Sequence, residues 1–480
     1  MTDSKMKLSK ILAQIKTEYT LPSGVIPDEV EVEDIAIDSR LVKKNSVFFA
    51  LPGKEKDGCE FIESALKNGA SLIITKHEAP STKHQFQLLV EFLKIFYAPL
   101  PTNIYAITGT NGKTSTAEFT RQILEFLGRK SASIGTLGVA CEASIQAQLQ
   151  NSSLTTPDIV SLYKNLSILK KNGVDDAAIE VSSIGLEQGR SAGLKFVAGA
   201  FTNFTRDHLD YHKSMEEYFR CKSLIFDQAA SAVLNSDIPE FEKLKKICDE
   251  KKLEVIEYGR KARDLRLEQD SFFLYKEKKY QFELSASGEF QQFNMLCALG
   301  NVISAHSLSE KELENLVKKF SDLHSAAGRM QLVATAPNQA KIYIDFAHTP
   351  DALTNVLHLA RKLTTSRVLV LFGCGGDRDK TKRPIMGRIA CDLADLVIIT
   401  DDNPRSEKPE EIRAEILKNC DSKKTIEINN RKAAIGHAIK LLEPNDILIL
   451  AGKGHEKYQI IGSEKTEFDE EKIVRESLNS

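Results

Sequence analysis

A glycine-rich turn between an apolar run and a helical pattern constrains the fold of this chain most strongly. Residues 103–108 are mostly apolar, Gly109 and Gly112 interrupt the run, and apolar residues then recur at helical spacing. A strand, a turn and a helix in this order form the frame of a phosphate-binding loop, because N–H groups of the turn and of the helix N-terminus face an anion. In such a frame Lys113 neutralises phosphate charge and the Thr114 hydroxyl ligates Mg²⁺.

The spacing of this loop departs from the strict pattern G-x-x-x-x-G-K-[ST], because Ile107 stands where the first glycine belongs. A strand-to-helix turn that contains Lys113 and Thr114 by chance is therefore the alternative interpretation. The strand and the helix on either side of the turn favour the phosphate loop.

Length, charge and cysteine spacing exclude several classes of protein. With 480 residues, 42% of them hydrophobic and 28% charged, the chain predicts a globular protein of several domains. A net charge of −2 indicates no nucleic-acid partner, and no apolar run approaches the ~20 residues of a membrane span. The first residues lack a hydrophobic signal segment, so we expect a cytoplasmic protein. Its eight cysteines lack zinc spacing and indicate reduced thiols.

The order of short strands and helices predicts an α/β protein of three domains. A small N-terminal α/β domain, residues 1–98, ends at segment 98–101, whose prolines indicate a linker. The central P-loop-type domain, residues 99–327, alternates strands with helices, so we expect a mostly parallel sheet. A break at 326–330 precedes a doubly wound, Rossmann-like domain, residues 328–480.

Two polar residues of the central domain are candidate cation ligands. Glu180 lies in the otherwise apolar strand 176–181, where a carboxylate is costly unless it is paired or binds a cation. His208 follows the expected strand 196–201 and could serve the same cation. A loop histidine that caps its own turn is an equally good interpretation of His208.

Lys222 lies at the centre of an apolar helix face. Its neighbours at helical spacing are Tyr218, Phe219, Ile225 and Phe226. Burial on such a face lowers the pKa of a lysine and makes the neutral amine accessible, and a neutral amine can capture CO₂ as a carbamate. The alternative is a lysine whose charged end reaches water while its stem is buried.

Four expected strands of the C-terminal domain each end in a polar motif. Because the carboxyl ends of parallel strands share one edge of a sheet, we expect these motifs to form one composite site. The glycine-rich motif lacks the G-x-G-x-x-G pattern, which disfavours a dinucleotide. The motifs cover residues 345–350, 373–379, 401–405 and 451–456, after strands expected at 341–345, 367–372, 396–400 and 446–450.

The charges of these motifs indicate a zwitterionic ligand. Arg378 and Arg405 suit carboxylates, because a guanidinium group binds a carboxylate through two parallel hydrogen bonds. Asp402 and Glu456 suit an ammonium group. An amino acid is the simplest ligand that carries both charges.

The loop Gly109–Thr114 resembles the nucleotide loop of the Mur ligases and the related folylpolyglutamate synthetases. The resemblance extends in order from residue 38 to Glu456 and is strongest to the Mur ligases that add the third residue of the peptidoglycan stem peptide. The further segments that carry it are 38–40, 48–50, 57–58, 68–70, 154–158, 180–183, 202–208, 215–226 and 401–405.

This resemblance implies a role for each candidate residue. It implies ATP binding by Gly109, Thr110, Asn111, Gly112, Lys113, Thr114, Ser115, Asn294 and Arg329. It implies Mg²⁺ binding by Thr114, Glu180, His208 and Lys222, the last as a carbamate, and catalysis by Lys113, Glu180, His208 and Lys222. It implies binding of the UDP-linked muramyl dipeptide by Ser39, Thr155, Thr156, Ser182, Gln188 and Arg190. It implies amino-acid binding by Arg378, Asp402, Asn403, Arg405, Gly452 and Glu456.

The expected activity is that of an ATP-dependent, ADP-forming acid–amino-acid ligase. The resemblance implies addition of meso-2,6-diaminopimelate to UDP-N-acetylmuramoyl-L-alanyl-D-glutamate through an acyl phosphate, and Arg405 can pair with the second carboxylate of diaminopimelate. We expect a monomer whose partners are these two substrates, without nucleic acid or membrane. The alternatives are a lysine-adding homologue, a folylpolyglutamate synthetase and an inactive nucleotide-binding scaffold.

Overall fold

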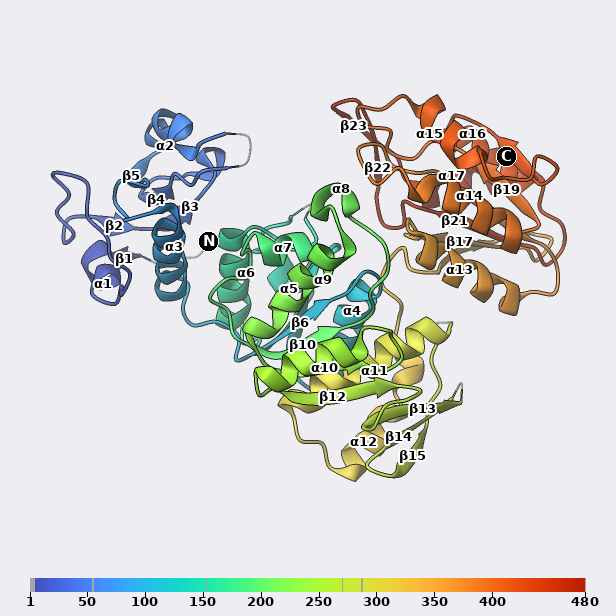
Figure 1. Ribbon diagram of the computed structural model, residues 1–480, viewed down its shortest axis with the longest axis horizontal. Coiled ribbons are helices and arrows are strands. Elements are labelled where there is room, and N and C mark those ends of the chain that lie inside the picture. The colour runs from blue at the N-terminus through green and yellow to red at the C-terminus, as the bar shows by residue number, and fades with distance from the viewer. Residues whose placement is uncertain (1–4, 54–55, 153, 270, 286–287, 480) are drawn as a thin grey trace.

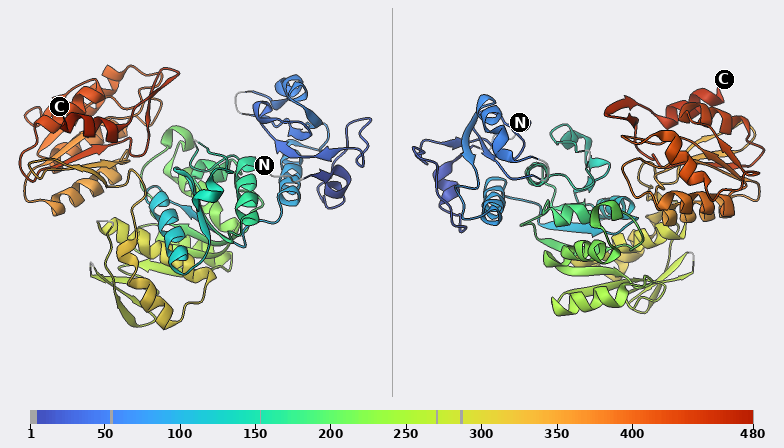
Figure 2. Two further views of the ribbon diagram at one scale, coloured as in Figure 1. Left: turned by 180° about the vertical axis from the view of Figure 1, so that it is seen from behind. Right: turned by 45° about the horizontal axis from the view of Figure 1, so that its top comes forward.

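The chain forms three lobes in a row, shown in Figures 1 and 2. The structure is a computed structural model that describes residues 5–53, 56–152, 154–269, 271–285 and 288–479. We call the lobes N-terminal (5–97), central (103–323) and C-terminal (328–479). The central lobe lies between the other two in every view. Each lobe combines helices with at least one parallel sheet, which confirms the expected α/β class.

The N-terminal lobe is built on a small parallel sheet of order β3-β4-β5. The buried strand β4 (Ser46–Phe49) lies in its middle. Helix α3 (Thr82–Phe96) packs a face of six buried residues toward the core, all of them apolar except Gln85, and Ser81 caps its N-terminus. The other elements are β1 (Met6–Lys7), α1 (Leu8–Leu12), β2 (Glu31–Val32), β3 (Asp34–Ala36), α2 (Ile62–Lys67) and β5 (Ala70–Ile74).

The central lobe holds a ten-stranded sheet of order β15-β14-β13-β12-β11-β10-β6-β9-β7-β8. The strands from β13 to β7 pair in parallel, and the strands beyond them at both edges pair antiparallel. In chain order the strands are β6 (Asn103–Thr108), β7 (Ser131–Gly135), β8 (Gly138–Ala140), β9 (Asp176–Glu180), β10 (Phe196–Phe201), β11 (Ala229–Asn235), β12 (Glu254–Gly259), β13 (Leu265–Gln269), β14 (Phe272–Tyr275) and β15 (Lys278–Gln281).

The helices of the central lobe cover its sheet, and two of them frame the glycine loop. Helix α4 (Lys113–Phe126) follows β6 directly, and α11 (Glu289–Ala305) packs along it. Because β6 is buried between β10 and β9, its apolar run Ile104–Ile107 has no solvent-facing side. The remaining helices are α5 (Ala143–Gln146), α6 (Ile159–Lys171), α7 (Ser183–Glu187), α8 (Leu209–His212), α9 (Met215–Ser223), α10 (Phe241–Glu250) and α12 (Glu310–Val317).

The C-terminal lobe has a six-stranded sheet of order β16-β17-β21-β18-β19-β20, in which only β16 runs antiparallel. Its strands are β16 (Gln331–Thr335), β17 (Lys341–Asp345), β18 (Val368–Phe372), β19 (Leu396–Ile399), β20 (Thr425–Glu427) and β21 (Ile447–Ala451), with a hairpin of β22 (Tyr458–Ile461) and β23 (Glu464–Glu467). Its helices are α13 (Pro350–Leu363), α14 (Lys382–Leu393), α15 (Pro409–Leu417), α16 (Arg431–Lys440) and α17 (Glu470–Leu478).

In the described part of the chain, no helix combines the length and the apolar character that a bilayer span requires.

A buried ion pair joins the N-terminal lobe to the central lobe. Lys164 on α6 donates to Asp34 Oδ2 over 2.7 Å, and the Tyr97 hydroxyl donates to Asp34 Oδ1 over 2.7 Å. The side chains of Asp34 and Lys164 keep only 12% and 11% of their surface exposed. Removing one partner of such a pair leaves a buried charge uncompensated, which is strongly destabilising.

We therefore expect Lys164→Ala to loosen the junction between these lobes. Proteolysis within segment 98–102 should become at least about fivefold faster, because a loss of about 1 kcal/mol raises the open population by that factor. The cleavage rate is measured by mass spectrometry of the released N-terminal fragment. Lys195→Ala, at an exposed position of the central lobe, is the control. Equal rates in the two variants would show that the ion pair does not hold the junction.

Candidate functional site

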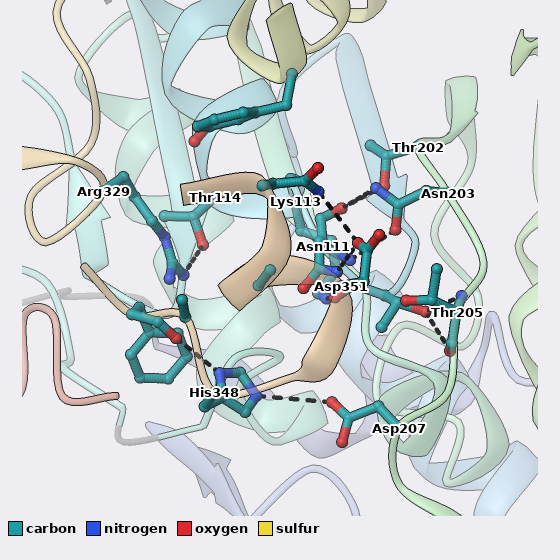
Figure 3. A pocket seen from close by; sticks show the side chains of 18 of the residues that line it. Asn111, Lys113, Thr114, Thr202, Asn203, Thr205, Asp207, Arg329, His348 and Asp351 are labelled. Carbon is teal, nitrogen blue, oxygen red and sulfur yellow. Dashed lines mark hydrogen bonds and ion pairs between the residues drawn. The ribbon is translucent and has the colours of Figure 1, made fainter. Parts of the chain in front are cut away.

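A cavity of about 1110 Å³ lies between the central and C-terminal lobes. Its walls come from the loops after β6, β9 and β10 on one side and after β17, β18, β19 and β21 on the other. The carboxyl edges of two parallel sheets thus face the same space, as the sequence predicts for the C-terminal motifs. Figure 3 shows residues of both lobes pointing into it.

The glycine turn has the backbone of a tight anion-binding loop. Gly109 and Gly112 have φ values of 143° and 83°, which side-chain-bearing residues rarely adopt. A Cβ atom at Gly112 would also collide with the amide of Asn294 on α11. Within the described chain no side chain caps the N-terminus of α4, so its N–H groups remain available to a phosphate.

Lys113 lies over its own loop. Its Nζ donates to the carbonyl oxygens of Gly109 and Thr110, each over 2.8 Å. Burial lowers the pKa of Lys113, while the carboxylates of Glu180 and Asp207 raise it. An ammonium group held only by two carbonyl oxygens beside the loop can exchange them for a phosphate that enters the loop.

Glu180 is buried at the end of β9, beside this loop. Thr114 Oγ1 donates to Glu180 Oε2 over 3.0 Å, and Thr136 donates through its N–H to Oε1 over 2.8 Å and through its hydroxyl to Oε2 over 3.1 Å. Burial raises the pKa of Glu180, and the charge of Lys113 lowers it. Arg329, which arrives from the C-terminal lobe, donates to Thr114 Oγ1 over 3.2 Å.

Lys222 on α9 is 1% exposed, as expected from its apolar neighbours. Its Nζ donates to Gly109 O over 2.7 Å and lies 4.5 Å from the ring centre of Tyr218. Burial lowers the pKa of Lys222 far below its usual range, and the nearby charge of Lys113 lowers it further. Lys222 and Lys113 therefore share one carbonyl acceptor, and a neutral Lys222 relieves their repulsion.

Asp207 is a site residue that no single-residue signal indicated in the sequence. It is 5% exposed, and its Oδ2 lies 3.5 Å from His208 Nε2 in the central lobe. The same oxygen lies 3.6 Å from His348 Nε2 in the C-terminal lobe, so Asp207 connects the two lobes (Figure 3). Its Oδ1 lies 3.8 Å from Lys382 Nζ. Although burial opposes it, the interaction with His348 and the surrounding positive charges hold the pKa of Asp207 well below its usual range.

Two further contacts tie the lobes together across the cavity. Asn111 of the glycine loop donates to Asp351 on α13 over 2.8 Å, and Arg206 donates to Asp379 over 3.2 Å. Asp379 is the last residue of one motif that the sequence predicts at the sheet edge, and Asp351 directly follows another. Their partners could not be identified from the sequence, because the relative position of two sheets leaves no periodic signal.

The residues of the C-terminal lobe that are expected to bind an amino acid lie together on the C-terminal side of the cavity. Asn403 donates to Glu456 Oε2 over 2.9 Å, and Arg405 donates to Gly376 O over 2.7 Å. Arg405 has φ 52°, a strained value of the kind often found at functional positions. The members of the expected set that line the cavity are Arg378, Asp402, Asn403, Arg405, Gly452 and Glu456.

Not all of the expected residues reach the cavity wall. Gly109 lies behind the wall, and Thr156 donates to Glu180 O over 3.0 Å from beneath it. Arg190 donates to Thr156 O over 2.9 Å and to Gln188, so these two lie further out. Ser39 lies in the N-terminal lobe. The remaining expected residues that line the cavity are Thr110, Asn111, Gly112, Lys113, Thr114, Ser115, Thr155, Glu180, Ser182, His208, Lys222, Asn294 and Arg329.

The cation ligands expected from the sequence form no closed cage. Among the described residues no cluster of three His, Cys, Asp or Glu side chains has metal-binding geometry. The Glu180 carboxylate and the Thr114 hydroxyl are nevertheless adjacent and open to the cavity. That donor set fits Mg²⁺, which commonly takes only one or two protein oxygens and completes its coordination with phosphate oxygens and water.

Three family models match the sequence: "Mur ligase family, catalytic domain" at residues 31–94, "Mur ligase middle domain" at 107–302 and "Mur ligase, glutamate ligase domain" at 328–454. A UDP-N-acetylmuramoyl-L-alanyl-D-glutamate--2,6-diaminopimelate ligase of Mesorhizobium japonicum is 42% identical over 95% of this chain and 98% of its own.

Solved structures share the fold over nearly the whole chain. One of a UDP-N-acetylmuramoyl-L-alanyl-D-glutamate--2,6-diaminopimelate ligase is 29% identical, with a TM-score of 0.66 over 99% of both chains. A MurF ligase from Thermotoga maritima in complex with ADP is 16% identical, with a TM-score of 0.59 over 88% of this chain and 94% of that one.

The imidazole of His208 should stay neutral at neutral pH. Burial lowers its pKa from 6.5 toward about 4, although Asp207 raises it. Because 36% of the side chain is exposed, burial lowers the pKa less than it would in a closed site. We therefore expect an NMR titration midpoint above 4 and clearly below 6.5. Because the unfolded chain takes up this proton first, His208 adds stability above pH 6.5 that is lost as the pH falls.

The His208 signal is assigned by its disappearance in His208→Gln. In urea-unfolded protein the midpoint should return to about 6.5. A folded-state midpoint at or above that value would contradict the expected desolvation.

Proposed function

The chain belongs to the Mur ligase family, and we propose that it joins meso-2,6-diaminopimelate to UDP-N-acetylmuramoyl-L-alanyl-D-glutamate in an ATP-dependent reaction. The observation that carries this proposal is the composition of one cavity. A glycine loop suited to phosphate lies on its central-lobe side, and two guanidinium groups with two carboxylates lie on its C-terminal side. A relative that is 42% identical has the same substrates in its name.

ATP binds with its phosphates on the loop from Gly109 to Ser115. The open N-terminus of α4, Lys113 and Arg329 provide positive charge, and Asn294 lies against the turn beside the α11 surface that carries Phe290 and Phe293. These aromatic rings provide an apolar surface for the base. The ADP complex of the Thermotoga maritima ligase, which has the same fold, supports a nucleotide here.

Glu180 and Thr114 would hold one Mg²⁺ ion, and His208 with carbamoylated Lys222 would hold a second. When bound, these ions would withdraw negative charge from phosphate oxygens. The chain contributes the orientation of the ligands: Thr136 bonds both oxygens of Glu180, and the neutral ring of His208 is free to act as a ligand. Lys222 reacts with CO₂ to give a carbamate and releases one proton to solvent, because burial lowers the pKa of its amine and so favours the neutral, nucleophilic form.

The reaction proceeds in two displacements. An oxygen of the D-glutamyl γ-carboxylate attacks the γ-phosphorus of ATP, and ADP leaves from an acyl phosphate. Lys113 offsets the charge that collects on the transferred group. The amine of diaminopimelate, which has lost a proton, then attacks the acyl carbon, and inorganic phosphate leaves as the amide forms.

Diaminopimelate binds at the C-terminal side of the cavity. Asp402 and Glu456 receive its ammonium group, while Arg378 and Arg405 receive carboxylates. Apart from burial, the charge of Arg378 is the largest influence that lowers the pKa of Arg405, so the two guanidinium groups repel each other. A ligand carboxylate between them relieves this repulsion, which favours an amino acid with a second carboxylate over lysine.

The muramyl dipeptide reaches the cavity along the other wall. Thr155 and Ser182 line the cavity, Thr156 lies directly behind them, and Gln188 and Arg190 lie further out. Ser39 of the N-terminal lobe contacts the UDP end. A single copy of the chain supplies every group named here, so the enzyme acts as a monomer, and it works in the cytoplasm, where ATP is available.

The reaction is tested by phosphate release from ATP and Mg²⁺ in the presence of the UDP-linked muramyl dipeptide. We expect release with meso-diaminopimelate, little with L-lysine and none without an amino acid. Arg405→Lys keeps the charge but loses the paired hydrogen bonds, so the KM for diaminopimelate should rise about tenfold or more.

Other results of this assay select the alternatives. Equal release with lysine would overturn the role of Arg405 in selection. Release with a folate and glutamate would indicate a folylpolyglutamate synthetase. ATP binding without release under any condition would indicate a nucleotide-binding scaffold.

The carbamate on Lys222 makes a separate prediction. Lys222→Ala should lower turnover at least about 100-fold, and a short carboxylate such as formate should restore part of it by occupying the vacated space. Protein equilibrated with ¹³C-bicarbonate should give a carbamate carbon signal that Lys222→Ala lacks. Lys213→Ala, at an exposed lysine nearby, should retain both signal and activity. Full activity of Lys222→Ala would exclude the role.

A further inference from the structure

A buried line of charges connects the last helix of the chain with the amino-acid side of the cavity. Glu470, on α17, accepts from Arg431 Nε over 2.8 Å. Arg431, on α16, also donates to Ala451 O over 2.8 Å, and its Nη1 lies 4.0 Å from Asp402 Oδ2. Arg431 and Glu470 are 1% and 3% exposed and do not line the cavity, whereas Asp402 does.

Asp402 retains an unused acceptor in this arrangement. Its Oδ1 accepts from the N–H of Asn403 over 2.7 Å, but across the described chain Oδ2 receives no hydrogen bond, although Asp402 is only 8% exposed. The Gly452 backbone lies close to this oxygen, because a Cβ atom there would lie 2.8 Å from Oδ2. A buried carboxylate oxygen without a hydrogen bond is costly, and an ammonium group bound to Asp402 from the cavity would offset this cost.

The partner of Arg431 determines whether Asp402 is available. Arg431 is fixed by Glu470 and Ala451 O, and its Nη1 is 4.0 Å from Asp402, beyond hydrogen-bonding distance. Without the charge of Glu470, the buried guanidinium would need another anion, and Asp402 Oδ2 is the adjacent carboxylate oxygen. A paired Asp402 would no longer attract an ammonium group.

We propose that Glu470 and Arg431 are positioning residues: Glu470 holds Arg431 back from a hydrogen bond with Asp402, which leaves Oδ2 of Asp402 to the ammonium group of the incoming amino acid. Neither residue touches the ligand, so they act through Asp402 alone. The inference rests on the proposed function, because it takes Asp402 as an ammonium-binding residue. It assigns to α17 a role in amino-acid affinity.

The variant that tests this is Glu470→Gln, which keeps the shape and a hydrogen-bond acceptor but removes the charge. The KM for diaminopimelate should rise about tenfold, while the KM values for ATP and the muramyl dipeptide and the value of kcat change less than about twofold. Glu471→Gln, at the next position of α17, should leave all these constants unchanged. A merely structural role would shift all three KM values or the melting temperature together.

A second substitution separates the charge argument from a loss of packing. In Arg431→Met/Glu470→Gln the guanidinium is absent, so Asp402 again receives no hydrogen bond from this position and the KM for diaminopimelate should return to within about threefold of the wild type. A KM for diaminopimelate as high in the double variant as in Glu470→Gln would overturn the inference, as would an unchanged KM in Glu470→Gln. If the wild type does not use diaminopimelate at all, the proposed function and this inference both fail.

Discussion

Parallel pairing of β6 with β9 on one side and β10 on the other is the constraint on which the site depends. Because the three strands run in the same direction, the glycine loop, Glu180 and the loop that ends at His208 emerge at one edge of the sheet. The pairing also explains why Lys222 can reach Gly109 O from a helix more than a hundred residues further along the chain. The C-terminal sheet repeats the principle and turns its own edge toward the same cavity.

The cavity holds several polar groups in unfavourable surroundings. Lys113 and Lys222 donate to the same carbonyl, Arg378 and Arg405 repel each other, and Oδ2 of Asp402 receives no hydrogen bond from the described residues. Each of these arrangements costs stability in the free protein. A highly charged ligand set with phosphates, carboxylates and an ammonium group offsets that cost, which is how a preorganised site obtains binding and catalysis from its fold.

Much of this organisation could be predicted from the sequence because it is local. The glycine loop, the apolar face around Lys222 and the polar ends of four C-terminal strands are each written in consecutive residues. The hairpin β14–β15 was not predicted, since Lys276 and Glu277 adopt positive φ in its turn without the usual glycine or asparagine. Asp207 and the contacts of Asn111 and Arg206 depend on how two sheets face each other, which no periodicity encodes.

The ion pair of Asp34 and Lys164 has a consequence for substrate selection. It fixes the N-terminal lobe on the central lobe at the opposite end of the molecule from the C-terminal lobe. In the proposed reaction one substrate must extend from the N-terminal lobe to the cavity, so the distance between the lobes selects this substrate by its length. A precursor one residue too short or too long could hold its nucleotide end and still present the wrong atom to the phosphate, and its binding energy would then do nothing for the chemistry.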